Sequence, residues 1–267
     1  MTTLRSAETL VIEGPDAIAF AHAQFSSKVT SLGVGQWQFS AWLTPQGRVR
    51  ALFQLARLAD NRLLALLRGG DAATVADALR RFVFRSRVDL AAAPPRALAS
   101  GPAAPMHAVH EDAGSISLGC ETHSLRIAEP GAGDDAWHAP QLSMGWPWLP
   151  PALQDELLPS SLSLQRLQAV AVDKGCYPGQ EIVARLHFRG GQKRHLHRVT
   201  LSQAARPGDV LRSDGREVSC VVDVVPSGDA IEALAILSDD FAAQAATGHP
   251  LALDGPLSMR IEASWPA

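Results

Sequence analysis

Three apolar runs that lie close together constrain the fold of this chain most. Residues 36–44 and 49–58 are rich in aromatic and aliphatic side chains, and the turn PQGR at 45–48 between them predicts a β-hairpin. A second turn at 60–61 leads into another apolar run at 62–67, so three consecutive strands are expected to pair antiparallel. Such a meander argues against a doubly wound parallel sheet, in which helices alternate with the strands.

Helical patterns lie on both sides of this meander. Residues 15–25 combine an early proline with apolar residues at helical spacing. Residues 72–84 suit an amphipathic helix that Asp71 would cap at its N-terminus, and residues 85–92 would form another strand. Strands, hairpins and helices mixed in this order predict an α+β fold class.

Composition divides the rest of the chain. Residues 93–105 are rich in Pro, Ala and Gly and predict a linker or long loop, and residues 145–163 contain four prolines without periodicity. From residue 197 onward, short strand patterns alternate with Gly- and Asp-containing turns, which predicts a small barrel-like β unit. We therefore expect an α+β subdomain at 1–92, a second one at 93–144, an irregular segment with a helix at 145–196 that packs back on both, and a β-rich domain at 197–267.

The overall charge and the cysteines exclude several classes of protein. With a net charge of −3 over 267 residues, the surface as a whole is not built to neutralise a nucleic-acid backbone. No run approaches about 18 apolar residues, and the N-terminal sequence lacks a signal-like apolar stretch, so we expect a cytoplasmic protein without a membrane partner. Three widely spaced cysteines without a CxxC pair predict neither a disulfide framework nor a metal site. Cys120 and Cys220 lie in strand-like runs and are expected to be buried.

Cys176 lies in a different setting, within the stretch DKGCYPGQEIVARLHFRGGQKRHLH at 173–197. The pattern predicts a helix that begins near Gln180, which puts Cys176 at or just before its N-terminus and beside Lys174. Free backbone amides, the helix dipole and the ammonium group would favour a thiolate there. The alternative is a small buried residue in a turn shaped by its glycines.

The same stretch is strongly cationic. Residues 174–198 hold 6 of the 24 Lys and Arg residues of the chain within 25 positions, together with three histidines. The plain interpretation is a solvated helix face. The alternative is a site for a polyanion, such as a glutamate tail or an RNA backbone, in which Arg185, Arg189 and Lys193 would take part.

The string KGCYPGQE, followed by VAR and RGGQKR, resembles the signature of the YgfZ family, whose members are relatives of the glycine cleavage T-protein. The resemblance covers roughly residues 10–90 and 137–198 and includes LTPQGRVRALFQL and RRFVFRSRVDL. It implies a ring of three subdomains around a central opening that binds tetrahydrofolate, with the β-rich C-terminal unit closing the ring. It also implies a role in iron–sulfur cluster assembly or repair, with iron–sulfur client proteins as partners and an indirect link to tRNA modification.

The resemblance nominates individual residues as well. Cys176 would be the reactive or cluster-contacting group, with Lys174 beside it. Trp137, in a predicted helix, would pack on the pterin or benzoyl ring of the folate, and a plain core position is the equal alternative. The other folate-binding residues implied are Tyr177, Gly179, Gln180, Glu181, Arg185 and Arg189.

The chain departs from the family pattern at positions that matter for a pterin. Ser143, Ser160 and Ser163 stand where the family carries an acidic residue or amides, and Lys28 replaces a further acidic residue. A lone serine is a poorer partner for the N–H groups of a pterin than a carboxylate or an amide.

Three functions stay open at this point. The first is a folate-binding accessory protein for iron–sulfur enzymes that need not be a classical turnover enzyme. The second is a tetrahydrofolate-dependent aminomethyl or one-carbon transferase of the T-protein type, against which the missing carboxylates weigh. The third is RNA binding through the basic helix. Only the first requires Cys176.

Overall fold

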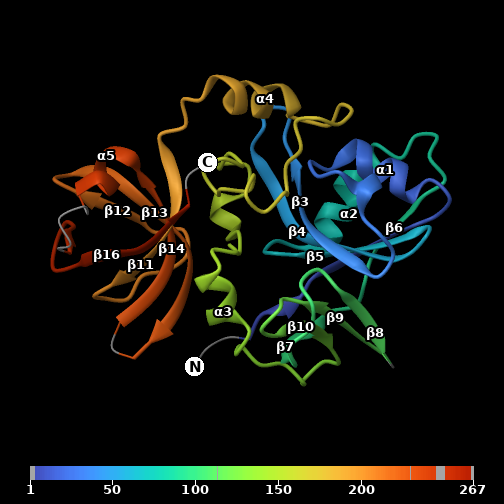
Figure 1. The fold of residues 1–267 in the computed structure, drawn as a ribbon, viewed down its shortest axis with the longest axis horizontal. Helices are drawn as coiled ribbons and strands as arrows, with labels where there is room; N and C mark the ends of the chain where they lie inside the picture. Colours follow the sequence, from blue (N-terminus) through green and yellow to red (C-terminus); the bar gives the residue numbers. More distant parts are fainter. Residues whose placement is uncertain (1–3, 113, 229, 245–249, 266–267) are drawn as a thin grey trace.

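Three sheets build the molecule (Figure 1). The computed structural model describes residues 4–112, 114–228, 230–244 and 250–265. In Figure 1 a six-stranded C-terminal sheet lies on one side, two five-stranded sheets lie on the other, and a largely irregular segment runs between them. All described strand pairs are antiparallel, which confirms the α+β prediction.

The first sheet contains the predicted hairpin. In spatial order its strands are β3 (Gln36–Leu43), β4 (Val49–Ala59), β5 (Arg62–Leu67), β2 (Thr9–Glu13) and β6 (Asp89–Ala92). The helices α1 (Ala17–Gln24) and α2 (Ala72–Arg80) share an apolar core with this sheet, and the short turn η1 (Val29–Ser31) follows α1.

Helix α2 begins as predicted but ends early. The Asp71 carboxylate accepts a hydrogen bond of 2.6 Å from the Thr74 amide, which satisfies one of the free N–H groups at the helix start. The helix ends at Arg80 rather than at Phe84, which is 89% exposed.

The second sheet corrects two expectations. Its order is β1 (Ser6–Ala7), β7 (Arg96–Gly101), β10 (Ser124–Ala128), β9 (Ser115–Gly119) and β8 (Val109–Asp112). The Pro- and Ala-rich stretch 93–105, expected as a linker, contains β7, because Leu98 and Ala99 are buried between neighbouring strands. The start of the chain also joins this sheet, since Ser6 pairs with Ala97.

The C-terminal unit is the predicted barrel, nearly closed. Its order is β12 (Val210–Ser213), β13 (Arg216–Ser227), β14 (Ala230–Ser238), β11 (Arg194–Leu201), β16 (Ser258–Trp265) and β15 (Leu251–Ala252), and the short α5 (Asp239–Ala242) follows β14. The two edges of the sheet meet: the Ser213 hydroxyl donates to the Ala252 carbonyl at 3.2 Å, and the Asp254 amide donates to the Arg212 carbonyl at 2.8 Å.

The segment 137–179 connects the three sheets. It contains only the short helix α3 (His138–Ser143), the turn η2 (Pro151–Leu153) and irregular chain, as its prolines predict. Trp146 and Trp148 share one continuous apolar core with residues of all three sheets, such as Trp37, Leu118 and Leu196. Helix α4 (Gln180–Arg189) then leads into the barrel (Figure 1). None of the helices described here is long and apolar enough to cross a membrane.

Candidate functional site

Cys176 is the one exposed thiol among the three cysteines. Cys120 and Cys220 are buried as predicted, and burial raises the pKa of the Cys120 thiol to about 11 and raises that of Cys220 as well. The alternative of a buried Cys176 is therefore wrong. Cys176 lies in an extended loop, three residues before the N-cap of α4 at Gly179.

Lys174 holds this loop against the end of α1. Its ammonium donates to the carbonyls of His22, Phe25 and Ser27 at 2.6, 2.5 and 2.9 Å, and it lies 4.8 Å from the centre of the Tyr177 ring. Burial lowers the pKa of Lys174 to about 8. All three N–H donors of the ammonium have backbone acceptors, so the structure gives Lys174 a bracing role rather than a direct contact with the thiol.

Three further residues of the motif brace the same loop. The Tyr177 hydroxyl donates to the Ala171 carbonyl at 2.9 Å, and the Gln180 amide donates to the Lys174 carbonyl at 3.0 Å. Gly179 has a φ of 78°, and a Cβ there would lie 2.5 Å from the Thr44 carbonyl, so only glycine fits. These contacts present Cys176 to solvent.

Helix α4 carries its charges on an open face. It runs from Gln180 to Arg189 as predicted and ends at Gly190, whose φ is 67°. Only Val183 is fully buried. Glu181, Arg185 and Arg189, all nominated as folate-binding, are exposed.

Trp137 is a core residue. Its side chain is 1% exposed, its indole N–H donates to the Asp134 carbonyl at 2.9 Å, and its ring centre lies 5.4 Å from that of Trp148. It lies immediately before α3, where it is the N-cap residue. It borders a cavity of about 390 Å³ next to His138, but its contacts are those of a packed side chain.

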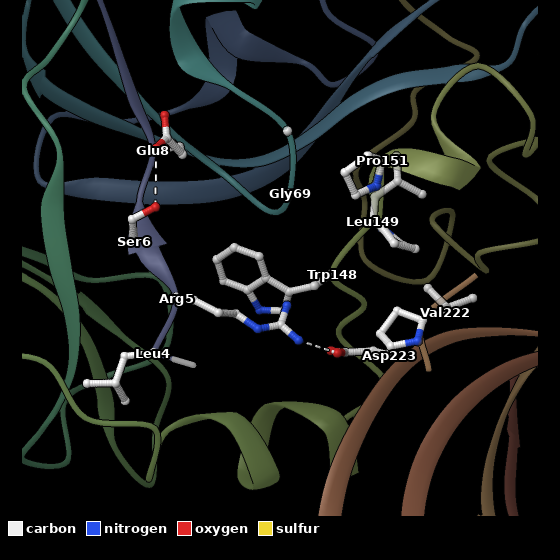
Figure 2. A pocket seen from close by; sticks show the side chains of 13 residues that line it. Leu4, Arg5, Ser6, Glu8, Gly69, Trp148, Leu149, Pro151, Val222 and Asp223 are labelled. Atoms are coloured by element: carbon white, nitrogen blue, oxygen red, sulfur yellow. Dashed lines mark hydrogen bonds and ion pairs between the residues drawn. The ribbon is translucent and has the colours of Figure 1, made fainter. Parts of the chain in front are cut away.

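A cavity of about 510 Å³ lies where the three sheets meet, and we call it the junction pocket (Figure 2). Arg5 and Glu8 reach it from the start of the chain, Trp148 from the connecting segment, and Asp223 from the barrel (Figure 2). Sequence reasoning missed this site because its parts are more than 200 positions apart in the chain.

Two charged side chains of the junction pocket, Arg5 and Asp223, form an ion pair, and the Glu8 carboxylate accepts hydrogen bonds from the Ser6 hydroxyl and the Ala72 amide. Arg5 donates to the Asp223 carboxylate at 2.5 Å, and His138 Nε2 lies 2.9 Å from the same carboxylate. Burial alone would raise the pKa of Asp223, but the His138 hydrogen bond and the Arg5 charge outweigh it and lower this pKa below its ordinary value. The guanidinium groups of Arg5 and Arg68 both lie 4.9 Å from the centre of the Trp148 ring.

Arg68 is fully buried and bound by neutral acceptors. It donates to the carbonyls of Trp146 and Pro147 at 2.9 Å each and to the side-chain oxygens of Gln54 and Gln141 at 3.1 and 2.8 Å. Burial lowers its pKa to about 9. The sequence contains a signal for a buried arginine here. Arg68 ends the apolar run in RLLALLRGG and stands just before two glycines.

A second cavity, of about 380 Å³, is lined by aromatic rings and amides, and we call it the aromatic slot. The ring centre of Trp146 lies 5.7 Å from that of Trp37 and 5.1 Å from that of Phe39. Gln38 and Gln168 provide amide groups on the same lining. The slot therefore combines aromatic surface with hydrogen-bonding groups that can both donate and accept.

Arg166 brings an uncompensated positive charge to the aromatic slot. Its guanidinium lies 4.7 Å from the centre of the Trp265 ring and donates to the Gly145 carbonyl. Among the described residues it has no carboxylate partner. Gly145 has a φ of 68°, and a Cβ there would lie 2.6 Å from the Trp265 ring, so this position favours glycine.

Ser27 joins the aromatic slot to the Cys176 loop. Its hydroxyl accepts a hydrogen bond of 2.7 Å from the Gln38 amide, and its carbonyl accepts the bond of 2.9 Å from Lys174. Neighbouring Ser26 donates to the Ala169 carbonyl at 2.6 Å. A side chain that lines the slot is thus one residue away from the brace of the Cys176 loop.

The residues that depart from the family pattern lie in varied surroundings. Ser143 is exposed, and the buried Ser160 hydroxyl has no hydrogen-bond partner within the described structure. Ser163 donates to the Trp265 carbonyl, and Lys28 pairs with Asp173 at 2.5 Å. No cluster of three His, Cys, Asp or Glu side chains in the described ranges could hold a metal ion.

Comparison with solved structures identifies the fold. Aminomethyltransferase T of the glycine cleavage system from Bartonella henselae superimposes with a TM-score of 0.67 over 95% of this chain and 82% of that chain, at 17% identity. The chain has the fold of the glycine cleavage T-protein. The predicted three-part ring architecture is therefore confirmed.

Sequence comparison gives partial relationships. An uncharacterized protein of Haemophilus influenzae is 26% identical over 226 residues, 78% of this chain and 77% of its own length. The tRNA-modifying protein YgfZ of Escherichia coli is 39% identical over 71 residues, which is 27% of this chain and 22% of YgfZ. That of Hamiltonella defensa is 28% identical over 126 residues, 47% of this chain and 37% of its own length. Part of this chain is homologous to the YgfZ proteins. No protein-family model matches the chain.

Proposed function

We propose that this protein is a cytoplasmic, folate-binding accessory protein in iron–sulfur cluster assembly or repair. Cys176 would contact a cluster or a thiol of a client protein, and the link to tRNA modification would run through iron–sulfur clients. The partial homology to proteins described as tRNA-modifying supports this proposal, as does the exposed Cys176 on a braced loop. The observation that carries it is the link through Ser27 between a ligand-sized cavity and that loop.

The aromatic slot suits tetrahydrofolate better than the junction pocket does. A pterin needs a flat apolar surface together with donors and acceptors, which Trp146, Gln38 and Gln168 supply. The glutamate carboxylates of a folate need a cation, and Arg166 lacks a carboxylate partner within the described structure. In the junction pocket, by contrast, Arg5 already has Asp223.

A folate bound in the slot would act on the Cys176 loop through Ser27. A ligand that competes for the Gln38 amide changes the hydrogen bond to the Ser27 hydroxyl, and the Ser27 carbonyl is one of three acceptors of Lys174. Folate binding would therefore alter how firmly Lys174 holds the loop that presents Cys176. In this proposal the folate acts as a sensor or regulator and not as a reactant.

A tetrahydrofolate-dependent aminomethyl or one-carbon transferase is the second candidate. The fold of aminomethyltransferase T favours it. None of the described residues that line the slot carries a carboxylate, however. The His107 imidazole is the group of the lining that could accept a proton for the transfer, and burial lowers its pKa.

The first experiment is calorimetric titration with tetrahydrofolate. Wild-type protein is expected to bind, and Gln168→Leu, which removes an amide of the slot, is expected to weaken binding by about tenfold. Gln203→Leu changes an exposed glutamine of the barrel and is the matched control, with unchanged affinity. Equal affinities of all three proteins would place the folate elsewhere, and absence of binding would rule out the folate part of the proposal.

A second experiment separates the two candidates. Cys176→Ser should retain the folded state by circular dichroism and the affinity for tetrahydrofolate, yet fail to restore iron–sulfur enzyme activity in cells that lack the protein. Full restoration by Cys176→Ser, together with turnover of an aminomethyl donor, would favour the transferase instead.

A further inference from the structure

Residues 80–87, RRFVFRSR, form an exposed basic and aromatic loop after α2. The loop contains four arginines, and no acidic residue lies between Asp77 and Asp89. Phe84 is 89% exposed, and the Arg85 guanidinium lies 5.4 Å from the centre of its ring. An exposed ring with a cation on it is not explained by the packing of the first sheet.

Helix α4 also combines an exposed phenylalanine with neighbouring arginines. Phe188 is 74% exposed and is followed by Arg189, and Arg185 lies one helical turn before. No acidic residue occurs between Glu181 and Asp209. The structure therefore exposes two phenylalanines, each next to arginines, in segments about 100 positions apart in the sequence.

Each of these two segments contacts the β3–β4 hairpin near its tip. Trp42, at the end of β3, makes an edge contact with Phe82 at 6.2 Å between ring centres, while the far end of the loop at Arg87 is bonded to Asp16. Gly47, in the turn of the hairpin, lies against Ile182 of α4. Figure 1 shows α4 across the upper end of β3 and β4. We call the combined surface of residues 80–87, the hairpin tip and α4 the hairpin-tip surface.

Several cations of the hairpin-tip surface are left without anionic partners. Arg80 pairs with Asp77, and Arg87 pairs with Asp16 at 3.4 Å. The cations of this surface without an ion pair to any described residue are Arg81, Arg85, Arg185 and Arg189, and Lys193, also without one, follows α4. Because the chain as a whole has a net charge of −3, these unpaired cations form a local positive patch and do not reflect an overall positive charge.

We propose that the hairpin-tip surface binds single-stranded RNA. Unpaired guanidinium groups neutralise phosphates, and exposed aromatic rings stack on unpaired bases, which is the combination that single-stranded nucleic acid requires. The homology of part of the chain to proteins described as tRNA-modifying agrees with RNA as the ligand. The proposed function gives tRNA only an indirect role, and the present inference is independent of the folate site.

The test is binding of a fluorescently labelled 15-nucleotide single-stranded RNA to the full chain, followed by anisotropy. Wild-type protein should bind, and Phe84→Ala and Phe188→Ala should each weaken binding about tenfold by removing a stacking surface. Val210→Ala, a change of an exposed apolar residue in the barrel, should bind as the wild type does.

The salt dependence tests the phosphate contacts separately. The double variant Arg81→Gln/Arg85→Gln should lower the slope of log affinity against log salt by about 1.4, or 0.7 for each lost contact on a single strand. The pair Arg212→Gln/Arg216→Gln on the barrel, both exposed, should leave the slope unchanged.

Three results would overturn the proposal. One is absence of RNA binding by the wild type at low salt, and another is equal binding by the phenylalanine variants. The third is binding to vesicles of 30% phosphatidylserine without binding to RNA, which would make the surface a membrane-contact site. Circular dichroism of each variant ensures that a loss reflects the surface and not unfolding.

Discussion

The junction pocket and the aromatic slot are both cavities beside the stretch Trp146–Pro147–Trp148, yet their electrostatics differ. In the junction pocket Arg5, Asp223 and His138 compensate one another, and two guanidinium groups approach the Trp148 ring. In the aromatic slot Arg166 has no carboxylate partner within the described ranges, although rings and amides surround it.

This difference favours the aromatic slot over the junction pocket as the proposed ligand site. A cavity whose buried charges are satisfied internally holds parts of the chain together, and a ligand entering it would have to break those pairs. In the aromatic slot, a carboxylate ligand would give Arg166 the anionic partner that it lacks among the described residues. For this reason we propose the smaller of the two cavities, and not the larger one, as the folate site.

The largest effect is expected from Asp223→Asn in the junction pocket. The substitution leaves the buried side of Arg5 and His138 without their anion, so the free energy of unfolding should fall by about 3 kcal/mol in urea titrations. Asp214→Asn, in an exposed turn of the barrel with a φ of 51°, is the matched control and should change stability little. A small effect of Asp223→Asn would show that the ion pair between Arg5 and Asp223 does not hold the junction together.

Acid should remove the difference in stability between the wild type and Asp223→Asn. Since the folded state lowers the pKa of Asp223 below its ordinary value of 3.8, the carboxylate stabilises the fold above that pH and ceases to do so as the pH falls through the folded pKa. The gap in unfolding free energy between wild type and Asp223→Asn should therefore be constant from pH 7 to about 5 and shrink below about 3.8. A gap that does not shrink at all as the pH falls below 3.8 would contradict this assignment.

In the aromatic slot, Arg166→Gln should affect ligand affinity more than stability. Tetrahydrofolate should bind about tenfold more weakly, because its glutamate carboxylates lose a charged partner. A tetrahydropterin without the glutamate tail should bind equally to both proteins. Arg260→Gln, an exposed arginine on the barrel, is the control. A loss for both ligands would mean that Arg166 shapes the slot rather than recognising the tail.

The smallest effect is expected for the Cys176 loop, which Ser27 links to the aromatic slot. Lys174→Met removes three hydrogen bonds to carbonyls, so amide hydrogen exchange across 173–179 should quicken about fivefold, while global stability changes little. Lys193→Met removes an exposed lysine as control. If tetrahydrofolate slows exchange in wild type but not in Lys174→Met, the coupling through Ser27 is supported. If tetrahydrofolate leaves the exchange rate of the wild type unchanged, the proposed coupling through Ser27 is wrong.

Local patterns predicted much of the fold. The hairpin around 45–48, the N-cap Asp71 and helix α4 depend on short-range geometry and propensity, which the sequence states directly. The strand within 93–105 was missed because its small residues are weak strand formers, and it is stabilised by neighbours on both sides of the second sheet.

The site was predictable only in part. The motif around Cys176 singled out the exposed thiol, and its neighbours Lys174, Tyr177 and Gln180 proved to brace the loop in this structure. Trp137 has the surroundings of a core tryptophan. Whether any of these residues meets a folate stays a prediction.

By itself the sequence determined the α+β class, the barrel, the place of helix α4 and the distinct character of Cys176, because each follows from spacing within a few turns or strands. Only the tertiary structure decided which charges meet. Arg5 and Asp223 are 218 positions apart and compensate each other, whereas Arg166 finds no carboxylate among the described residues. The physical reason is that compensation depends on distances of a few ångströms between segments that chain order does not relate.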